Sequence, residues 1–331
     1  MVLKVGLIGC GNVGRSMHLP GYRSLEGVEV AALCDIDASS LNKAGDRFGV
    51  SRRYLDASEM MRNEHLDIVT VAVPPASHAE CCVIAMEGGA HVLVEKPFVE
   101  CVGDAERVIA TASKTGRRVC VSQNYRYLWV TQAAKDAVVH GDIGRPYHIS
   151  IWQYLHSDPA SWPEWKREMS MPHLLEFGVH MCDFLRHIFA ADPVSVYARM
   201  RSFDWAPHGD SADMMLVDFG NQQTASIILN QASQGNMEWL ESRIEGEEGS
   251  VRLSFVSSAT LSARGASAPV AIGTPDADSP FESSAARSLG RLVDAIASGA
   301  EPPTPPEDNL KSLAIVWGAY ESARTGEVVH L

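Results

Sequence analysis

Basic residues are scarce in this chain, where 28 Lys and Arg stand against 41 Asp and Glu and the formal net charge is −13. Non-specific binding to nucleic acid or to anionic membranes needs a basic surface, so this balance argues against both partners. Long apolar runs are also missing, because no stretch approaches the ~20 apolar residues of a membrane-spanning helix. The first apolar run leads directly into a glycine turn, unlike a signal peptide. We therefore expect a soluble, cytoplasmic protein.

Cysteines are few and irregularly spaced. An odd count of seven without a regular pattern is a poor disulfide framework, and the absence of a CxxC pair argues against structural zinc. Reduced, buried thiols are the simplest interpretation. The seven positions are Cys10, Cys34, Cys81, Cys82, Cys101, Cys120 and Cys182.

The first third of the chain alternates strand-like and helix-like segments. Runs rich in Val, Ile and Leu without polar alternation predict strands that are covered on both faces. These runs lie at 3–8, 28–34, 68–73, 92–94 and 119–121. Helix candidates lie at 14–25, 38–48, 58–63, 77–88 and 102–115. Strands and helices in alternation predict an α/β domain with a doubly wound parallel sheet, which we place at 1–122.

The pattern changes in the remainder, 123–331, where strands follow one another closely. Such spacing predicts an antiparallel or mixed sheet in a second, α+β domain. The strand candidates are 147–154, 194–203, 214–219, 224–229, 237–244, 250–255 and 260–263. The helix candidates are 130–140, 174–189, 281–298 and 308–325.

A GxGxxG motif at 9–14 follows the first predicted strand and opens the first predicted helix. In such a loop one glycine permits the tight turn, one lets a pyrophosphate approach, and one lets the helix pack on the strand. Asp35 ends the next strand, 35 − 14 = 21 residues after the last glycine, where a dinucleotide site has its ribose-binding carboxylate. We therefore predict a Rossmann domain. The expected cofactor contacts here are Gly9, Gly11, Asn12, Val13, Gly14, Asp35 and Ile36.

The carboxylate of Asp35 also bears on the choice of cofactor. It would repel the 2′-phosphate of NADP, and its neighbours Cys34, Ile36 and Asp37 include no arginine. NAD is therefore favoured. Arg15 follows the glycine loop, so use of NADP stays open.

Two further loops follow strands at the carboxyl edge of the predicted sheet, where ligands of such folds bind. Val73, Pro74, Pro75 and His78 belong to the first loop, and Glu95-Lys96-Pro97 ends the fifth strand. A lysine at that edge would lie beside the nicotinamide and could polarise a substrate oxygen. A surface position for His78 and a surface Glu–Lys pair are the alternatives.

The predicted helix 174–189 carries Glu176, His180 and Asp183 at spacings of four and three, which place them on one helix face. Charged groups on an otherwise apolar helix are costly to bury without a purpose. A histidine can act as a base near neutral pH, and a carboxylate can fix its tautomer. Zinc and a purely structural network are the alternatives. An HExxH motif is absent, so we expect no metal.

Together these features resemble the Gfo/Idh/MocA oxidoreductases over nearly the whole chain. The resemblance rests on the glycine loop, Val73-Pro74-Pro75 with His78, Glu95-Lys96-Pro97, Asn124-Tyr125-Arg126 and Gly178-x-His180-x-x-Asp183. It implies a second domain with a large open sheet, which supports homodimers or homotetramers. It also implies NAD(P)-dependent oxidation or reduction of a sugar, cyclitol or related polyol.

The resemblance implies catalytic roles for Lys96 and His180, with Glu176 beside them and Asp183 in support. In this hypothesis His180 removes a hydroxyl proton, Lys96 stabilises the alkoxide, and NAD+ accepts the hydride. The cofactor contacts then also include Val73, Pro74, Pro75, His78, Glu95, Lys96 and Asn124. The expected substrate contacts are Lys96, Tyr125, Arg126, Trp152, Trp165, Glu176 and His180.

The chain departs from the family at Glu176, where many members have Asp, often after a glycine-rich run. Here the residues before it include Ser170-Met171-Pro172-His173. The substrate therefore stays open. Two other functions also stay open: an NAD-dependent glycoside hydrolase, and a non-catalytic NAD-binding regulator.

Overall fold

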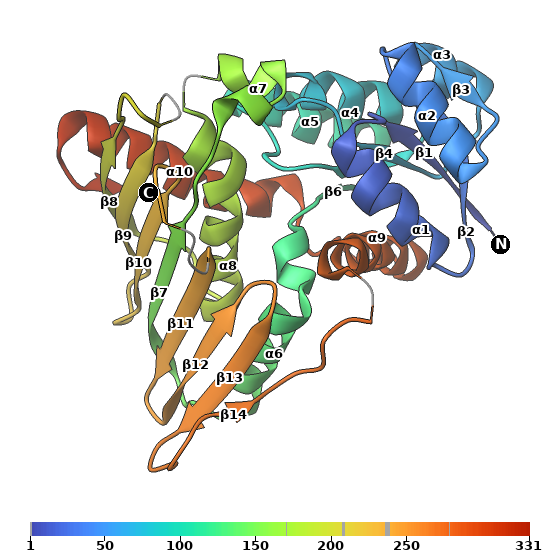
Figure 1. Ribbon diagram of the computed structural model, residues 1–331. Helices are drawn as coiled ribbons and strands as arrows, with labels where there is room; N and C mark the ends of the chain where they lie inside the picture. The colour runs from blue at the N-terminus through green and yellow to red at the C-terminus, as the bar shows by residue number, and fades with distance from the viewer. Residues whose placement is uncertain (1, 170, 207–208, 236–238, 278) are drawn as a thin grey trace. The chain divides into compact units, whose positions relative to one another are not determined.

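The computed structural model describes residues 2–169, 171–206, 209–235, 239–277 and 279–331 (Figure 1). The chain divides into two compact units, Met1–Tyr127 with Asp278–Leu310, and Leu128–Ala277 with Lys311–Leu331. The expected boundary after residue 122 lies five residues before the end of the first segment. The segment from 278 to 310, expected in the second domain, belongs to the first unit. Among the described residues, no helix is long and apolar enough to cross a bilayer.

The first unit contains a parallel six-stranded sheet in the order β3-β2-β1-β4-β5-β6. Its strands are β1 Leu3–Ile8, β2 Val28–Cys34, β3 Arg53–Tyr54, β4 Ile68–Val71, β5 His91–Val94 and β6 Val119–Val121. The strand order reverses between β1 and β4, which is the switch point of a doubly wound fold. The predicted parallel sheet is therefore confirmed. The sequence did not indicate β3, which has only two residues.

Helices connect the strands of this unit. They are the π-helix η1 Gly14–His18, α1 Leu19–Arg23, α2 Ala38–Phe48, α3 Ala57–Asn63, α4 His78–Glu87, α5 Val102–Thr115 and α9 Pro280–Ser298, with 3-10 turns at Pro75–Ser77 and Asn124–Tyr127. α2 begins after Asp37, whose carboxylate accepts hydrogen bonds from the backbone N–H groups of Ser39 and Ser40. Leu289 and Leu292 of α9 complete one apolar core of this unit with Val5 and Ile68.

The second unit contains a nine-stranded sheet in the order β14-β13-β12-β11-β7-β10-β9-β8-β15. Its strands are β7 Pro146–Tyr154, β8 Ser195–Arg201, β9 Ala212–Asp218, β10 Thr224–Asn230, β11 Leu240–Gly246, β12 Gly249–Ser254, β13 Ser258–Ala263, β14 Val270–Ala271 and β15 Val329–His330. Only β7 and β10 pair in parallel among the described pairings, so the sheet is mostly antiparallel, as predicted. The expected strand at 237–244 begins outside the described residues and continues as β11.

Helices cover one face of this sheet. α8 packs on β7, and α6 packs on β12 and β13 (Figure 1). The helices of this part of the chain are α6 Trp129–His140, α7 Glu164–Glu168, the π-helix η5 Leu174–Gly178, α8 Val179–Phe189 and α10 Pro306–Thr325, with a 3-10 turn at Pro159–Ser161. On the opposite face, Met214 and Leu216 of β9 are 55% and 59% exposed.

Candidate functional site

At two of the three glycines of the glycine loop, atoms of the chain itself leave no room for a side chain. Gly9 has φ +103°, and a Cβ there would lie 2.3 Å from the carbonyl oxygen of Ala72. A Cβ on Gly14 would lie 2.4 Å from the carbonyl oxygen of Gly9. A Cβ on Gly11, in contrast, would meet no described atom within 4 Å. A ligand that approaches the backbone at Gly11 explains that glycine, and a dinucleotide pyrophosphate does so in this fold.

Asp35 joins the end of β2 to this loop. Its carboxylate accepts hydrogen bonds from the backbone N–H of Cys10 at 2.7 Å and of Asp37 at 2.8 Å. A carboxylate has about four acceptor positions, so it can also accept from ribose hydroxyls. The neighbouring Ile36 is 93% exposed. Arg15, which left NADP open, donates from Nη1 to the carbonyl oxygen of Cys10 at 2.6 Å.

Glu95, at the end of β5, belongs to a buried chain of polar side chains. Because a carboxylate only accepts, His18 donates to it from Nε2 at 2.8 Å. His18 Nδ1 lies 3.1 Å from the hydroxyl of Tyr22, and Tyr22 also contacts the hydroxyl of Thr70. Burial alone would raise the pKa of Glu95, but the hydrogen bond and charge of His18 and the charge of Lys96 lower it to about 2. Glu95 is therefore ionised, and it joins the residue before Lys96 to the buried side chain of His18.

The lowered pKa of Glu95 predicts a specific loss of folding stability in acid. A carboxyl whose pKa is lowered in the folded state stabilises the fold above its unfolded pKa of about 4.3, and that stabilisation is lost as the pH falls toward 2. Between pH 6 and pH 3 the wild type should lose about 2 kcal/mol more than Glu95→Gln. Urea unfolding at the two pH values measures this difference. Glu29→Gln, at an exposed position of β2, is the control and should follow the wild type. Equal losses in the wild type and Glu95→Gln would contradict the assignment.

His78 lies at the start of α4 and is completely buried. Its Nδ1 lies 2.9 Å from the carbonyl oxygen of Pro97, and its Nε2 lies 2.9 Å from that of Val73. Burial lowers the pKa of the ring, so it is neutral and donates to one of the two. His78 thus ties the loop that follows β4 to the residues that follow Lys96. Its expected place among the cofactor contacts stays a prediction.

Lys96 follows β5 and is partly exposed, and its backbone N–H donates to Glu95 Oε2 at 3.2 Å. The peptide bond from Lys96 to Pro97 is cis. Asn124 is buried and donates to the hydroxyl of Ser284 at 3.4 Å. The structure thus holds the backbone of Lys96 on the buried Glu95.

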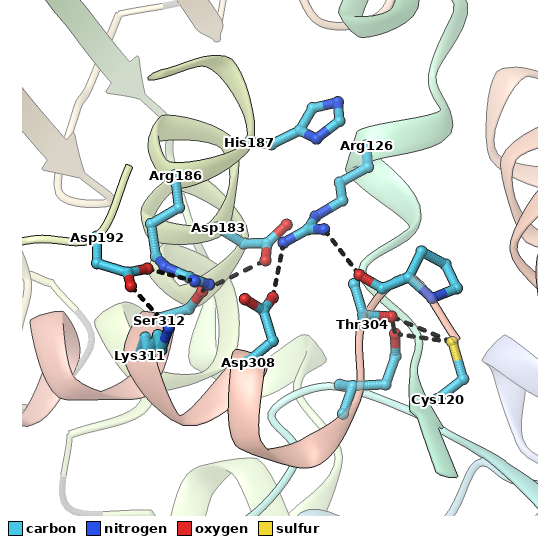
Figure 2. A network of polar contacts seen from close by, with 12 residues as sticks. Cys120, Arg126, Asp183, Arg186, His187, Asp192, Thr304, Asp308, Lys311 and Ser312 are labelled. Atoms are coloured by element: carbon cyan, nitrogen blue, oxygen red, sulfur yellow. Dashed lines mark hydrogen bonds and ion pairs between the residues drawn. The ribbon is translucent and has the colours of Figure 1, made fainter. Parts of the chain in front are cut away.

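Tyr125 and Arg126, both expected at the substrate, have partners inside the first unit. The ring of Tyr125 lies 6.0 Å from that of Phe281. Arg126 donates to the carbonyl oxygen of Pro303 at 3.2 Å and pairs with Asp308 at 3.3 Å (Figure 2). Arg126 therefore ties residues after β6 to the segment that leads into α10.

In the second unit, η5 and α8 form one continuous segment that carries Glu176, His180 and Asp183. Glu176 lies in the π-helical turn and His180 in α8, so ideal α-helical spacing does not apply to this pair. His180 is 4% exposed, and its ring lies nearly perpendicular to that of Phe177, with the two ring centres 6.3 Å apart. The first turn of the segment therefore departs from the helix that the sequence predicted.

Asp183 is 1% exposed and accepts a hydrogen bond from Ser312 of α10 at 3.3 Å. Ser312 also accepts from Arg186, whose other terminal nitrogen pairs with Asp192 at 2.9 Å (Figure 2). Lys311 completes the network with a 2.6 Å bond to Asp192. Asp183 therefore joins α8 to α10. Its supporting role beside His180 stays a prediction.

The ion pair of Glu176 was not predicted. Lys166 of α7 lies with Nζ 2.8 Å from Glu176 Oε2, and each side chain is about one-fifth exposed. The ammonium also lies 4.8 Å from the ring centre of Trp162. Trp165, an expected substrate contact, is partly exposed on the same short helix. The fold of the loop brings Lys166, Trp162 and Glu176 together. No local sequence pattern could therefore indicate this ion pair.

A buried acid cluster holds the start of η5, and this too was missed. Asp210 accepts from the backbone N–H of His173 at 2.9 Å and of Leu174 at 2.7 Å, and from the hydroxyl of Tyr320 at 3.3 Å. Asp210 has no exposed surface. One carboxylate thus satisfies two N–H groups at the beginning of the helix that carries Glu176 and His180.

Next to this cap, His173 and Asp213 form a close pair, with Nδ1 3.5 Å from Oδ2. Burial and the charge of Asp210 raise the pKa of Asp213, while burial lowers that of His173 to about 4. Burial thus disfavours the charged form of both groups. The other ring nitrogen of His173 lies 2.8 Å from the amide oxygen of Gln153.

Trp152 does not lie with these groups. Successive side chains of a strand point to opposite faces of the sheet. Gln153 of β7 points to the face that carries His173. Trp152, one residue earlier, therefore points to the opposite face from His173, and its expected contact with substrate stays a prediction. The residue type suggested a pocket wall, but the pleat of β7 decides its direction.

The first unit thus has the topology and glycine loop of a dinucleotide-binding domain, and the second presents a histidine and a carboxylate at a helix start. Residues 3–123 match the NAD-binding Rossmann fold of an oxidoreductase family, and residues 131–252 match the GFO/IDH/MocA C-terminal domain. The chain belongs to the Gfo/Idh/MocA family and is an NAD-binding oxidoreductase.

Individual relatives agree with this placement. A protein named D-apiose dehydrogenase from Paraburkholderia graminis is 29% identical over 99% of this chain and 89% of its own length. An inositol 2-dehydrogenase from Salmonella typhimurium is 29% identical over 60% of this chain and 58% of its own length. An Agrobacterium radiobacter oxidoreductase, crystallised with NAD+, L-tartaric acid and magnesium, has a TM-score of 0.92 at 26% identity and covers 100% of this chain and 98% of its own.

Proposed function

We propose that the protein is an NAD-dependent dehydrogenase that acts on a secondary or primary alcohol of a sugar, cyclitol or related polyol. The observation that carries this proposal is the buried His180, on a helix start that also presents Glu176, in a chain whose other unit binds NAD. The whole-length similarity to proteins named D-apiose dehydrogenase supports the substrate class.

Each proposed residue has a task in this reaction. Gly9, Gly11, Gly14 and Asp35 hold the cofactor, which supplies the hydride acceptor when it is bound. His180 removes the hydroxyl proton. The ammonium of Lys96 stabilises the negative charge that develops on the substrate oxygen. Asn12, Val13, Ile36, Val73, Pro74, Pro75, Glu95 and Asn124 remain proposed cofactor neighbours, and Tyr125, Arg126 and Trp165 remain proposed substrate neighbours.

A substrate screen tests the proposal. Purified protein is incubated with NAD+ or NADP+ and with free sugars, sugar acids and inositols, and the absorbance of the reduced nicotinamide is followed. Net reduction of NAD+ with a polyol is the expected result. Cleavage of an aryl glycoside without net reduction would favour the hydrolase instead, and NAD binding without turnover would favour a regulator.

The preference for NAD rests on Asp35. Replacement of Asp35 by Ser together with Ile36 by Arg removes the carboxylate and adds a cation for a 2′-phosphate. The ratio of kcat/KM for NAD+ to that for NADP+ should fall at least about tenfold, which corresponds to ~1.4 kcal/mol. Asp37→Asn is the matched control, because Asp37 caps α2 and should not touch the ribose. A ratio that is unchanged in the double variant would contradict the role of Asp35.

We also propose that the uncovered face of the nine-stranded sheet forms a homodimer or homotetramer contact. Exposed apolar side chains such as Met214 and Leu216 support this, because contiguous apolar surface marks interaction sites. The double variant Met214→Glu and Leu216→Arg should reduce the mass seen by light scattering to that of one chain. Val139→Glu, at a 67% exposed position of α6, is the control and should keep the wild-type mass. A wild-type mass in the double variant would contradict the proposal.

A cytoplasmic location is proposed as well. All seven cysteines are free, which suits a reducing compartment. Seven reactive thiols in denatured, unreduced protein are the expected result of a thiol titration. Fewer than seven would count against that location.

A further inference from the structure

Lys166 and Glu176 form a donor and an acceptor side by side at the helix start that carries His180. Their charged atoms lie 2.8 Å apart, and the side chains are 19% and 20% exposed. The pair is thus partly shielded from water yet still open to a small solute.

Lys166 is held in place by its surroundings. Its ammonium lies 4.8 Å from the ring centre of Trp162, a distance at which a cation is attracted to the face of the ring. Trp162 is 9% exposed and donates from Nε1 to the hydroxyl of Ser157 at 3.0 Å. The turn before it is capped by Asp158, which accepts from the backbone N–H of Ala160 at 2.9 Å. The lysine is therefore ordered before any ligand arrives.

The chemistry of the pair fits two neighbouring hydroxyls. An ammonium has three N–H donors, of which the ion pair uses one, and a carboxylate has about four acceptor positions. One hydroxyl of a vicinal diol can accept from the ammonium while the next donates to the carboxylate. The pair has no net charge, so a substrate carboxylate would meet attraction from one group and repulsion from the other.

We infer that Lys166 and Glu176 together bind two neighbouring hydroxyls of a neutral polyol, and that the balance of their two opposite charges determines the preference between neutral and acidic substrates. This inference rests on the proposed function, since it names the substrate class of that same site. It predicts opposite effects of the two residues on charge preference. Loss of Lys166 leaves an anion that repels sugar acids, whereas loss of the charge of Glu176 leaves a cation that attracts them.

The test compares Lys166→Met and Glu176→Gln with wild type on a fixed panel: D-apiose, D-xylose, D-glucose and myo-inositol as neutral compounds, and D-glucuronate and D-galacturonate as acids. Binding to the NADH-saturated protein is measured by calorimetry, and turnover is measured separately. The acid-to-neutral ratio of binding constants should rise at least tenfold in Glu176→Gln and fall in Lys166→Met. Arg167→Met, one residue away on the exposed side of α7, is the control and should keep the wild-type ratio.

The outcomes separate the inference from the proposed function. An acid-to-neutral ratio that rises in Glu176→Gln and falls in Lys166→Met supports the inference. If the compounds bind in this way but none is turned over, only the proposed dehydrogenase activity is overturned. A purely structural role of the ion pair would weaken binding of acids and neutral compounds equally, and that result would overturn the inference. Absence of binding of every panel compound to the wild type would overturn both.

Discussion

Replacement of Lys96 by alanine is expected to lower kcat by about 10³-fold or more, while the Kd for NAD+ stays within about threefold. The reason is that the ammonium stabilises charge that exists on the substrate oxygen only in the transition state. The backbone of Lys96 remains held by Glu95, so the loop should keep its shape without the side chain. Steady-state kinetics and calorimetric titration with NAD+ measure the two quantities.

Two further variants sharpen this test. Lys96→Arg keeps the positive charge but changes its geometry, so an intermediate rate is expected. Lys114→Ala removes an exposed lysine of α5 and should leave kcat and NAD+ binding unchanged. A Lys96→Ala enzyme with wild-type kcat would remove Lys96 from the reaction.

Replacement of Asp210 by alanine is expected to lower the free energy of unfolding by about 3 kcal/mol or more. The variant would leave the N–H groups of His173 and Leu174 without their acceptor in a buried place. Each such unsatisfied group costs about 1–3 kcal/mol. For a unit of this size, the midpoint of thermal unfolding should fall by roughly 10 °C. Circular dichroism during heating measures the shift.

Asp210→Asn provides the graded control, because its single amide oxygen can accept one of the two hydrogen bonds. Its midpoint should lie between those of the wild type and the alanine variant. Asp218→Ala removes an exposed carboxylate that accepts from Gly220, and it should change the midpoint far less. A shift in Asp210→Ala no larger than that in Asp218→Ala would show that the cap is dispensable.

Strand and helix positions followed closely from the sequence because apolar periodicity is a local property. β1, β2, α2 and α5 begin and end where the pattern predicted. β3, β14 and β15 have two residues each, too few to form a pattern. The π-helical turns η1 and η5 also escaped prediction, since each continues into an α-helix of the same apolar pattern.

The candidate site was predictable only where its chemistry is contiguous in sequence. The glycine loop, Glu95-Lys96-Pro97 and the segment that carries His180 are local motifs. The Asp210 cap joins residues 36 and 37 apart, and Lys166 reaches Glu176 across a turn of the chain. Such partners become neighbours only through the tertiary fold. Trp152 is the opposite case. It is part of a strand that the sequence predicted, but the sheet face to which its side chain points follows from the alternation along β7 and from which face the helices cover.

The position of α9 has a consequence for the order in which the protein is made. Leu289 and Leu292 close a core that also contains Val5 and Ile68, yet the 150 residues from 128 to 277 intervene (277 − 128 + 1). At a translation rate of about 5–20 residues per second, that interval lasts roughly 8–30 s. During this time the nascent nucleotide-binding sheet lacks part of its apolar cover on the ribosome. Residues 128–277, the larger part of the second unit, must therefore be synthesised before the first unit can be completed.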